Sequence, residues 1–235
     1  MLLSLTAEMR RTGIRRLAVL AGDADWCCQQ ARQWRATLTG DWLCLSEDAQ
    51  LPHSVAPSAL RNLLGQEFLH AVFDARQGFH SEAFAALAGT LRAGSWLLLL
   101  TPPWEAWPQR PDSDSLRWSE SDTPLATPVF VRHLQRQLDA DGQVLLHRQQ
   151  HAPRLPSPLT LTAWQPAGAQ QQQRLLNHLL QAPPGISVLT AARGRGKSAL
   201  ARALAQRWPG RCLVTAPAKV STAVLARFAG AGFAF

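Results

Sequence analysis

A phosphate-binding loop is the pattern that most restricts how this chain can fold. Residues 186–200 read I-S-V-L-T-A-A-R-G-R-G-K-S-A-L: a β-branched apolar run, a turn of small residues, and a Gly-Lys-Ser that opens a helix. This order predicts a buried strand, a loop whose backbone amides point inward, and a helix. The pattern therefore indicates an α/β domain that binds the phosphates of a nucleotide between strand and helix.

The groups that a nucleoside triphosphate needs are present in this loop. Gly194 and Gly196 let the backbone approach the phosphates without a Cβ in the way. Lys197 supplies a mobile cation, Ser198 a hydroxyl for magnesium, and the start of the following helix a positive dipole end. The strict pattern has a further glycine where this chain has Ala191, which weakens the match. The alternative is a chance Gly-Lys-Ser at a helix start.

Charge is unevenly distributed along the 235 residues, whose formal net charge is +8. Residues 1–150 hold 14 Arg against 16 Asp and Glu, whereas residues 151–235 hold ten Lys or Arg and no Asp or Glu. The basic end is therefore the expected nucleotide or nucleic-acid face, with a solvated basic surface as the alternative. A P-loop NTPase also needs a second-strand carboxylate to hold magnesium. Since residues 151–235 contain none, we expect the chain to stop inside the ATPase domain.

The cysteines and the apolar segments indicate a cytoplasmic protein. Cys27, Cys28, Cys44 and Cys212 lack the spacing of metal ligands and are expected to be reduced core residues. The amino-terminal segment reaches charged residues early and has the pattern of an amphipathic helix rather than a signal peptide. The longest uncharged apolar stretch, Ser95–Pro103, is too short to cross a bilayer, so no membrane partner is expected.

Strand and helix patterns alternate in the first 150 residues. The fourth apolar run, Trp96–Thr101, is apolar almost throughout, as a strand covered on both faces would be. We expect a Rossmann-like domain over residues 1–150 with a parallel, doubly covered sheet. Ser81 is the expected cap of the middle helix and Gly94 its stop. The predicted strands are 16–21, 42–46, 69–74, 96–101 and 143–148, and the predicted helices are 25–38, 81–92 and 129–138.

Polar residues around the end of the third predicted strand are candidates for a ligand site. They are His70, Asp74, Arg76 and His80, and α/β folds often bind ligands at this edge of the sheet. Capping and turn roles explain them at least as well. Gly-Asp at residues 22–23 is not the G-x-G-x-x-G pattern, so dinucleotide binding is not expected.

A Pro- and Asp-rich segment, residues 102–128, carries Trp104, Trp107 and Trp118. These indoles have two interpretations, stacking on RNA bases or anchoring the long segment onto the domain. Anchoring is the commoner role of tryptophans in such a segment.

A proline-rich stretch, residues 151–168, is the predicted linker before a truncated RecA-like domain over residues 169–235. A glutamine-led helix is expected at Gln170–Leu180, because the run Q-Q-Q-Q-R-L-L-N-H-L-L has helical spacing. A glutamine amide can pair with N6 and N7 of adenine, which favours ATP over GTP; a polar helix start is the alternative. Beyond the loop we expect a strand at Cys212–Thr215, a helix from Ser221, and a terminal strand.

Taken together, these segments resemble one family. The stretches T-A-A-R-G-R-G-K-S-A-L, V-T-A-P-A-K, G-I-R-R-L, H-A-V-F-D-A-R and D-S-L-R-W-S, spread over essentially the whole chain, are similar to the bacterial tRNA(Met) cytidine acetyltransferases, TmcA. The resemblance implies an N-terminal α/β domain followed by a RecA-like ATPase domain, a GNAT acetyltransferase domain and a tRNA-binding region. It also implies acetylation of N4 of the wobble cytidine of elongator tRNA(Met), with acetyl-CoA as donor and ATP or GTP hydrolysis as driving force.

The resemblance implies a nucleotide site with magnesium on Ser198. Gln172 is the glutamine matched to the base contact, although its three neighbours from Gln170 to Gln173 remain open. The acetyl-CoA motif, the acidic magnesium residues and the distal arginine of the family are not in this sequence, so we expect no acetylation, little hydrolysis, and self-association through the exposed apolar end. The implied ATP contacts are Gln172, Gly194, Arg195, Gly196, Lys197, Ser198, Ala199 and Leu200.

Two other interpretations come from different classes of protein. One is a nucleotide- or RNA-binding module without catalysis. The other is a self-standing small P-loop kinase or ATPase, against which the missing carboxylates argue.

Overall fold

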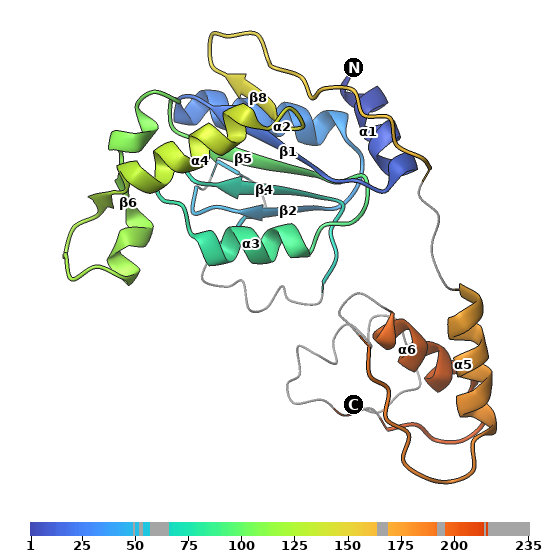
Figure 1. Cartoon of the computed structure of the whole chain (residues 1–235). Helices are drawn as coiled ribbons and strands as arrows, with labels where there is room; N and C mark the ends of the chain where they lie inside the picture. The colour runs from blue at the N-terminus through green and yellow to red at the C-terminus, as the bar shows by residue number, and fades with distance from the viewer. Residues whose placement is uncertain are drawn as a thin grey trace. The chain divides into compact units, whose positions relative to one another are not determined.

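The computed structural model describes residues 1–48, 50–51, 54–56, 66–163, 169–191, 196–213 and 215. The chain divides into two compact units, Met1–Trp164 and Gln165–Phe235. Each unit is described by itself, and Figure 1 shows the elements of both.

The N-terminal unit is built on a sheet of six strands, each parallel to its neighbours, in the order β3-β2-β4-β5-β1-β8 (Figure 1). This confirms the predicted parallel sheet. The strands are β1 Arg16–Ala21, β2 Trp42–Leu45, β3 Ser54–Val55, β4 His70–Asp74, β5 Trp96–Thr101 and β8 Leu145–Arg148.

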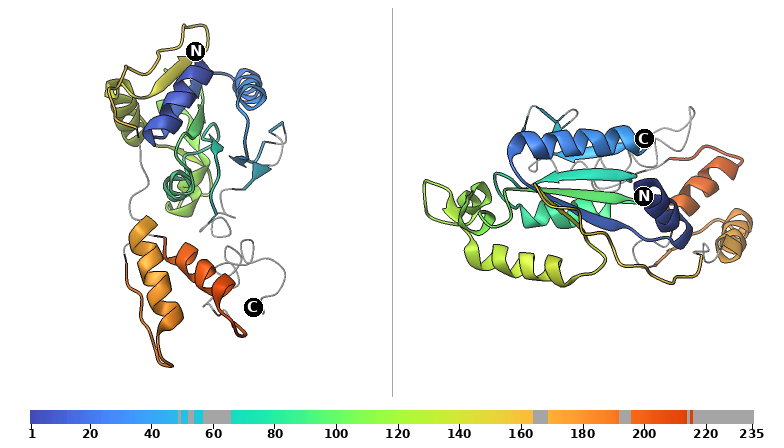
Figure 2. Two further views of the ribbon diagram at one scale, coloured as in Figure 1. Left: turned by 90° about the vertical axis from the view of Figure 1, so that its right-hand side faces the viewer. Right: turned by 90° about the horizontal axis from the view of Figure 1, so that it is seen from above.

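Helices cover both faces of the sheet (Figure 2). On one face, side chains of β1, β4 and β5 pack with those of α3 (Ser81–Gly89) and α4 (Pro128–Ala140). On the other face, α1 (Leu2–Thr12) and α2 (Ala24–Thr37) pack against the alternate residues of the same strands. All six residues of β5 are buried, as expected for a central strand between two helical layers.

The segment between β5 and α4 folds as a hairpin with short turns of 3₁₀-helix. Its elements are η2 (Trp107–Gln109), β6 (Pro111–Asp112), η3 (Ser113–Arg117) and β7 (Leu125–Ala126), with β6 antiparallel to β7. Asp112 holds the segment together, because its carboxylate accepts from the backbone amides of Phe79 at 3.2 Å and Asp114 at 2.9 Å. Its other oxygen accepts from the Thr127 hydroxyl at 3.2 Å.

The middle helix starts at Ser81 as predicted, but its predicted cap and its predicted end were wrong. His80, not Ser81, is the N-cap, because its ring Nδ1 accepts from the Ala83 amide at 3.2 Å. The helix ends at Gly89 rather than at 92, because Leu91 leaves it to form a parallel bridge with Phe68. The backbone pairing of Leu91 with Phe68 thus takes the place of the last predicted turn of this helix. The sequence pattern also missed the short edge strand β3.

The second unit has two described helices, α5 (Ala169–Gln181) and α6 (Lys197–Arg207), which agree with the predicted glutamine-led helix and loop helix. The expected strand before the loop is absent, since residues 186–190 are described and form no strand. Of the predicted strand at 212–215, the described residues 212, 213 and 215 show only one bridge residue, Leu213. A strand needs hydrogen-bonded neighbours, and the described part of this unit offers none to residues 186–190.

The start of the predicted linker contacts the N-terminal unit. Arg154 forms an antiparallel bridge with Leu146 of β8, and the Ser157 amide donates to the Gly142 carbonyl at 2.7 Å. The Arg154 guanidinium also donates to the carbonyls of Asp139 and Leu138, each at 2.6 Å. The domain boundaries proposed from the sequence, 150 and 168, stay predictions.

Candidate nucleotide-binding loop

The start of α6 has one backbone feature that is typical of a phosphate loop. Gly196 is the N-cap of the helix and is left-handed, with φ 78° and ψ 20°. An L side chain rarely adopts this conformation, so glycine is required for its backbone freedom. Its carbonyl accepts from the Leu200 amide at 2.9 Å, which begins the helical ladder. The chain thus turns sharply at Gly196 and starts a helix whose first amides lack helical partners.

Lys197 lies in the first turn of α6, and its side chain contacts Ala191. Its ammonium Nζ donates to the backbone carbonyl of Ala191 at 2.6 Å. Ala191 is the position at which the strict pattern has its first glycine, so the hydrogen bond joins the first and the penultimate positions of the motif. A lysine ammonium at the start of a helix is a cation of the kind that contacts phosphate oxygens in phosphate-binding loops.

Gln172 of α5 lies against Gly196. A Cβ built on Gly196 would collide with the side-chain nitrogen of Gln172, so the two residues are in close contact. The helices α5 and α6 contact each other, and each has a buried leucine, Leu176 in α5 and Leu200 in α6. The structure thus brings a predicted base-contacting residue beside a predicted phosphate-contacting one.

The neighbouring glutamine is used differently. The side-chain amide of Gln173 donates to Asn177 Oδ1 at 2.9 Å along α5. This i to i+4 contact keeps Gln173 on the helix surface.

The remaining predicted contacts are placed as follows. Ser198 and Ala199 are exposed in the first turn of α6, whereas the side chain of Leu200 is buried, so its side chain serves packing. Gly194 and Arg195 lie outside the described residues. Among the described residues, no group of three or more His, Cys, Asp or Glu side chains lies together as a metal site.

The polar candidates of the N-terminal sheet have structural roles. His70 is fully buried, stacks on Trp42 with ring centroids 4.7 Å apart, and its Nδ1 accepts from the Trp96 amide at 3.1 Å. Burial lowers the pKa of His70 to about 4. Arg76 donates to Asp74 and Asp48, each at 2.7 Å, with its own side chain 7% exposed. The capping and turn interpretation therefore accounts for Asp74, Arg76 and His80, whereas His70 packs in the core.

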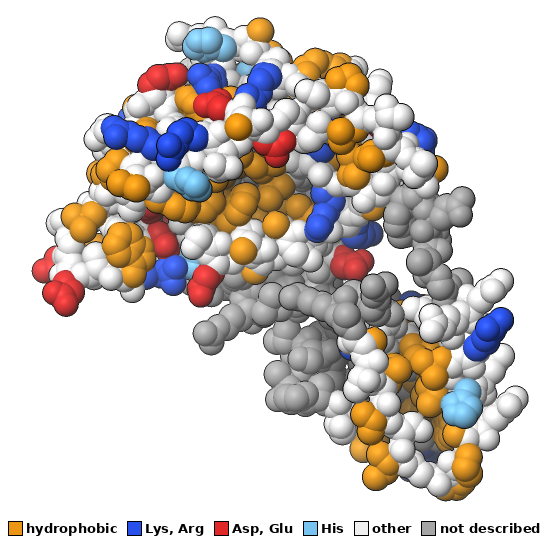
Figure 3. All heavy atoms as spheres, in the orientation of Figure 1, with side chains coloured by type: hydrophobic (Ala, Val, Ile, Leu, Met, Phe, Trp, Pro, Cys, Tyr) orange, Lys and Arg blue, Asp and Glu red, His pale blue; other side chains and the backbone are white. Residues whose placement is uncertain are grey.

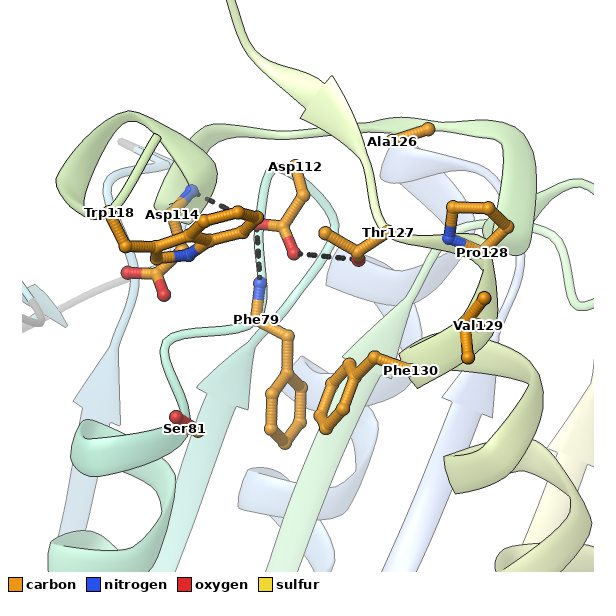
Figure 4. Close-up of a pocket in the computed structure, with 10 residues that line it drawn as sticks. All are labelled: Phe79, Ser81, Asp112, Asp114, Trp118, Ala126, Thr127, Pro128, Val129 and Phe130. Carbon is orange, nitrogen blue, oxygen red and sulfur yellow. Dashed lines mark hydrogen bonds between the residues drawn. The ribbon is translucent and has the colours of Figure 1, made fainter. Parts of the chain in front are cut away.

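Two of the three tryptophans anchor the segment and the third is exposed; stacking on RNA stays a prediction for the third. Trp104 and Trp107 are 6% and 4% exposed and pack in the core, so they anchor the segment. Trp118 is 61% exposed and borders an open hollow of about 470 Å³. Phe79 and Phe130 line the hollow opposite Trp118 (Figure 4). These two phenylalanines could not be singled out from the sequence, because an aromatic residue near a helix start has no pattern that distinguishes a groove from the core.

The structure also describes the burial of the four cysteines and the length and apolarity of the helices. Cys27, Cys28 and Cys44 are buried, and burial raises the pKa values of Cys27 and Cys44 to about 12, so these thiols stay protonated. Cys212 is only partly buried. In the part of the chain that the structure describes, no helix combines the length and apolarity needed to cross a bilayer.

Comparison with known proteins gives matches to two family domains. Residues 1–149 match the family described as tRNA(Met) cytidine acetyltransferase TmcA, N-terminal. Residues 188–234 match the RNA cytidine acetyltransferase NAT10/TcmA helicase domain. The first match alone covers more than half of the chain.

Individual relatives are similar over almost the whole chain. The tRNA(Met) cytidine acetyltransferase TmcA of Citrobacter koseri is 54% identical over 239 residues, covering 99% of this chain and 35% of the relative. The TmcA of Salmonella typhimurium is 51% identical over 235 residues, with the same coverage of 99% and 35%. That of Haemophilus influenzae is 41% identical over 165 residues, or 70% of this chain and 25% of the relative. The chain thus spans about a third of the length of these relatives.

Proposed function

Because the chain belongs to the tRNA(Met) cytidine acetyltransferase TmcA family, we propose that it provides the nucleotide-binding loop of an ATP-dependent tRNA acetyltransferase. The whole protein, in this proposal, forms N4-acetylcytidine at the wobble position of elongator tRNA(Met) from acetyl-CoA. Residues 151–235 contain no Asp or Glu, so this stretch supplies nucleotide binding and no carboxylate for hydrolysis. Residues 151–235 are therefore expected to bind nucleotide with little hydrolysis of their own.

The proposed site uses the loop and the first turn of α6. The backbone amides from Gly194 to Ser198 face the phosphates, the Lys197 ammonium contacts the outer phosphate oxygens, and the Ser198 hydroxyl holds magnesium. Gln172 pairs with the adenine edge. The observation that carries the proposal is the contact between Gln172 and Gly196. It brings a candidate base contact and a candidate phosphate contact together, although the two residues lie 24 positions apart in sequence.

The test of the phosphate contact is Lys197→Ala, with magnesium ATP binding measured by calorimetry. A hydrogen bond to a charged group contributes about 1.5–3 kcal/mol, so we expect an affinity loss of roughly 10- to 100-fold. Arg207→Gln is the control, since it removes the same charge from the last turn of α6, away from the loop. Equal affinities in the parent and Lys197→Ala, or no binding by the parent, would contradict the proposal.

The base contact has its own test. Gln172→Ala is expected to weaken ATP about 5- to 100-fold while leaving GTP unchanged, because a bidentate amide contact to adenine discriminates by about 1–3 kcal/mol. Gln171→Ala, one residue earlier on the exposed surface of α5, is the matched control. An equal loss for ATP and GTP would assign Gln172 to packing of the loop instead of base selection.

A further inference from the structure

A second charged hollow lies on the N-terminal unit, on the flank of α4. It has a volume of about 490 Å³ and is lined by Arg132, Gln135, Arg136 and Asp139 of α4 together with Trp104. The Gln135 amide donates to the Trp104 carbonyl at 2.5 Å, which fixes the helix to the anchored segment. The wall of the hollow is therefore a buried indole and a helix tied to it.

The negative charge at this hollow is already neutralised. Asp139 accepts from Arg148 at 2.9 Å and lies 3.9 Å from Arg154. The Arg148 guanidinium also stacks over the Trp104 ring, 4.9 Å from its centroid, and lies 3.6 Å from Glu105. Two arginines thus compensate the two carboxylates at this edge, with Arg148 shared between Asp139 and Glu105.

Arg132 and Arg136 have no such partner. Both side chains are exposed, and in the described part of the chain neither guanidinium is within ion-pair distance of a carboxylate. They stand at i and i+4, about 6 Å apart along the helix axis, where like charges repel each other. In the space-filling view, basic side chains gather over α4 (Figure 3). The hollow therefore presents two uncompensated positive charges side by side.

The neighbouring hollow beside Trp118 has the opposite character. It is lined by aromatic side chains together with Asp112 and Asp114, so its charge does not favour an anion. The two hollows meet at Val129, which lines both. Attraction for an anion is thus confined to the arginine flank of α4.

We propose that the flank of α4 formed by Arg132 and Arg136 binds the phosphate backbone of RNA. Planar guanidinium groups contact phosphate oxygens in bidentate fashion, and successive phosphates offer a negative charge to each of two arginines one helical turn apart. This inference rests on the proposed function for its choice of RNA as the polyanion. It assigns the N-terminal unit a sequence-independent contact that positions the substrate.

The test is Arg132→Gln/Arg136→Gln in the 235-residue chain, with binding of fluorescein-labelled tRNA(Met) followed by anisotropy from 50 to 300 mM salt. Each lost phosphate contact reduces the slope of log K against log salt by about 0.7–0.9. We expect the double variant to lower the slope by about 1.5 and the affinity at 0.1 M salt at least ~10-fold. An unrelated tRNA should show the same losses, because backbone contacts carry no sequence information.

Arg11→Gln/Arg92→Gln is the matched control. It also removes two positive charges, but from exposed arginines that are already paired with Glu8 and Asp41. Its slope should stay close to that of the parent. Equal slopes for the two double variants, or no RNA binding by the parent chain, would overturn the proposal. So would recruitment of the parent, but not the α4 variant, to phosphatidylserine vesicles without RNA binding, because the partner would then be a membrane surface.

Magnesium ATP binding by the same proteins separates this inference from the proposed function. The α4 double variant should bind ATP like the parent, and Lys197→Ala should keep the RNA slope. Loss of ATP binding in the parent with the RNA result intact would remove the nucleotide-loop proposal alone. Intact folding of the α4 variant is checked by its thermal unfolding curve, which exposed arginines should leave unchanged.

Discussion

Two apolar runs of similar composition end in opposite environments. R-L-A-V-L-A, the strand β1, lies between β5 and β8, and Ala18, Val19 and Leu20 are fully buried. I-S-V-L-T, the run before the nucleotide loop, leaves Ile186 96% and Val188 82% exposed. The first run has a hydrogen-bonded neighbour on each side and a helical layer over each face; the second has neither among the described residues.

The difference shows that local sequence sets the capacity to form a strand and the neighbours decide the outcome. A β-branched run lowers the cost of the extended backbone, but its amides and carbonyls still need partners. At β1 those partners come from segments about 80 and 130 residues later in the chain. The first half of the chain thus carries its own strand neighbours.

The largest expected effect comes from one substitution made in both environments. Leu99→Ala in β5 removes a fully buried side chain and should lower the free energy of unfolding by about 3–5 kcal/mol. Leu189→Ala, at a residue 41% exposed before the loop, should change it by less than about 0.5 kcal/mol. Urea unfolding followed by tryptophan fluorescence measures both. A comparable loss at Leu189 would mean that residues 186–190 are buried in solution.

A middle-sized effect depends on pH and on the buried histidine of the N-terminal unit. Burial lowers the pKa of His70 from its ordinary value of 6.5 to about 4, so the folded state resists protonation. The stabilisation is complete above pH 6.5 and is lost as the pH falls towards 4. We expect the free energy of unfolding to fall by about 2 kcal/mol between pH 7 and pH 5.

His70→Gln is the control for that pH dependence. A glutamine keeps an acceptor for the Trp96 amide but does not titrate, so the fall in stability over this range should largely disappear. Unfolding curves at several pH values give the comparison. An unchanged pH dependence in His70→Gln would assign the titration to other groups.

The smallest expected effect compares two glycines at helix ends. Gly196→Ala forces a side chain into a left-handed conformation and against Gln172, so it should destabilise the start of α6 by about 1–2 kcal/mol. Gly89→Ala at the end of α3 meets open space and should be neutral or stabilise by up to about 1 kcal/mol. Amide hydrogen exchange at Leu200 and in α3 reads the two helices separately. Equal protection of Leu200 in the parent and Gly196→Ala would contradict the strain at this turn.

Most of the N-terminal sheet could be predicted from the sequence, because its apolar runs are dense and bounded by turn residues. The bounds of β1 and β5 agree with the prediction at both ends. The two-residue strand β3 and the early end of α3 could not be predicted, since both depend on pairing with distant segments. A local sequence pattern does not show which distant segment will form backbone hydrogen bonds with it.

The candidate site was predictable in its residue types and less so in its surroundings. Gly196, Lys197 and Gln172 follow from the motif and from the glutamine-led helix, and the contact between α5 and α6 gives that grouping a physical basis. The arginine flank of α4 was not predictable. Ion pairs between Arg148 of β8 and the carboxylates of Glu105 and Asp139 determine which arginines of this region lack an acidic partner. Helical spacing places arginines on a surface but does not say which of them are neutralised.

In the proposed nucleotide site, the hydrogen bond from Lys197 to the Ala191 carbonyl would make capture of a nucleotide an exchange rather than a simple addition. An arriving phosphate must take the ammonium from a peptide oxygen that already solvates it. The measured affinity then reports how much better a phosphate serves this cation than the chain's own carbonyl does. Altering the backbone around Ala191 would accordingly tune nucleotide retention without touching any group that meets the nucleotide.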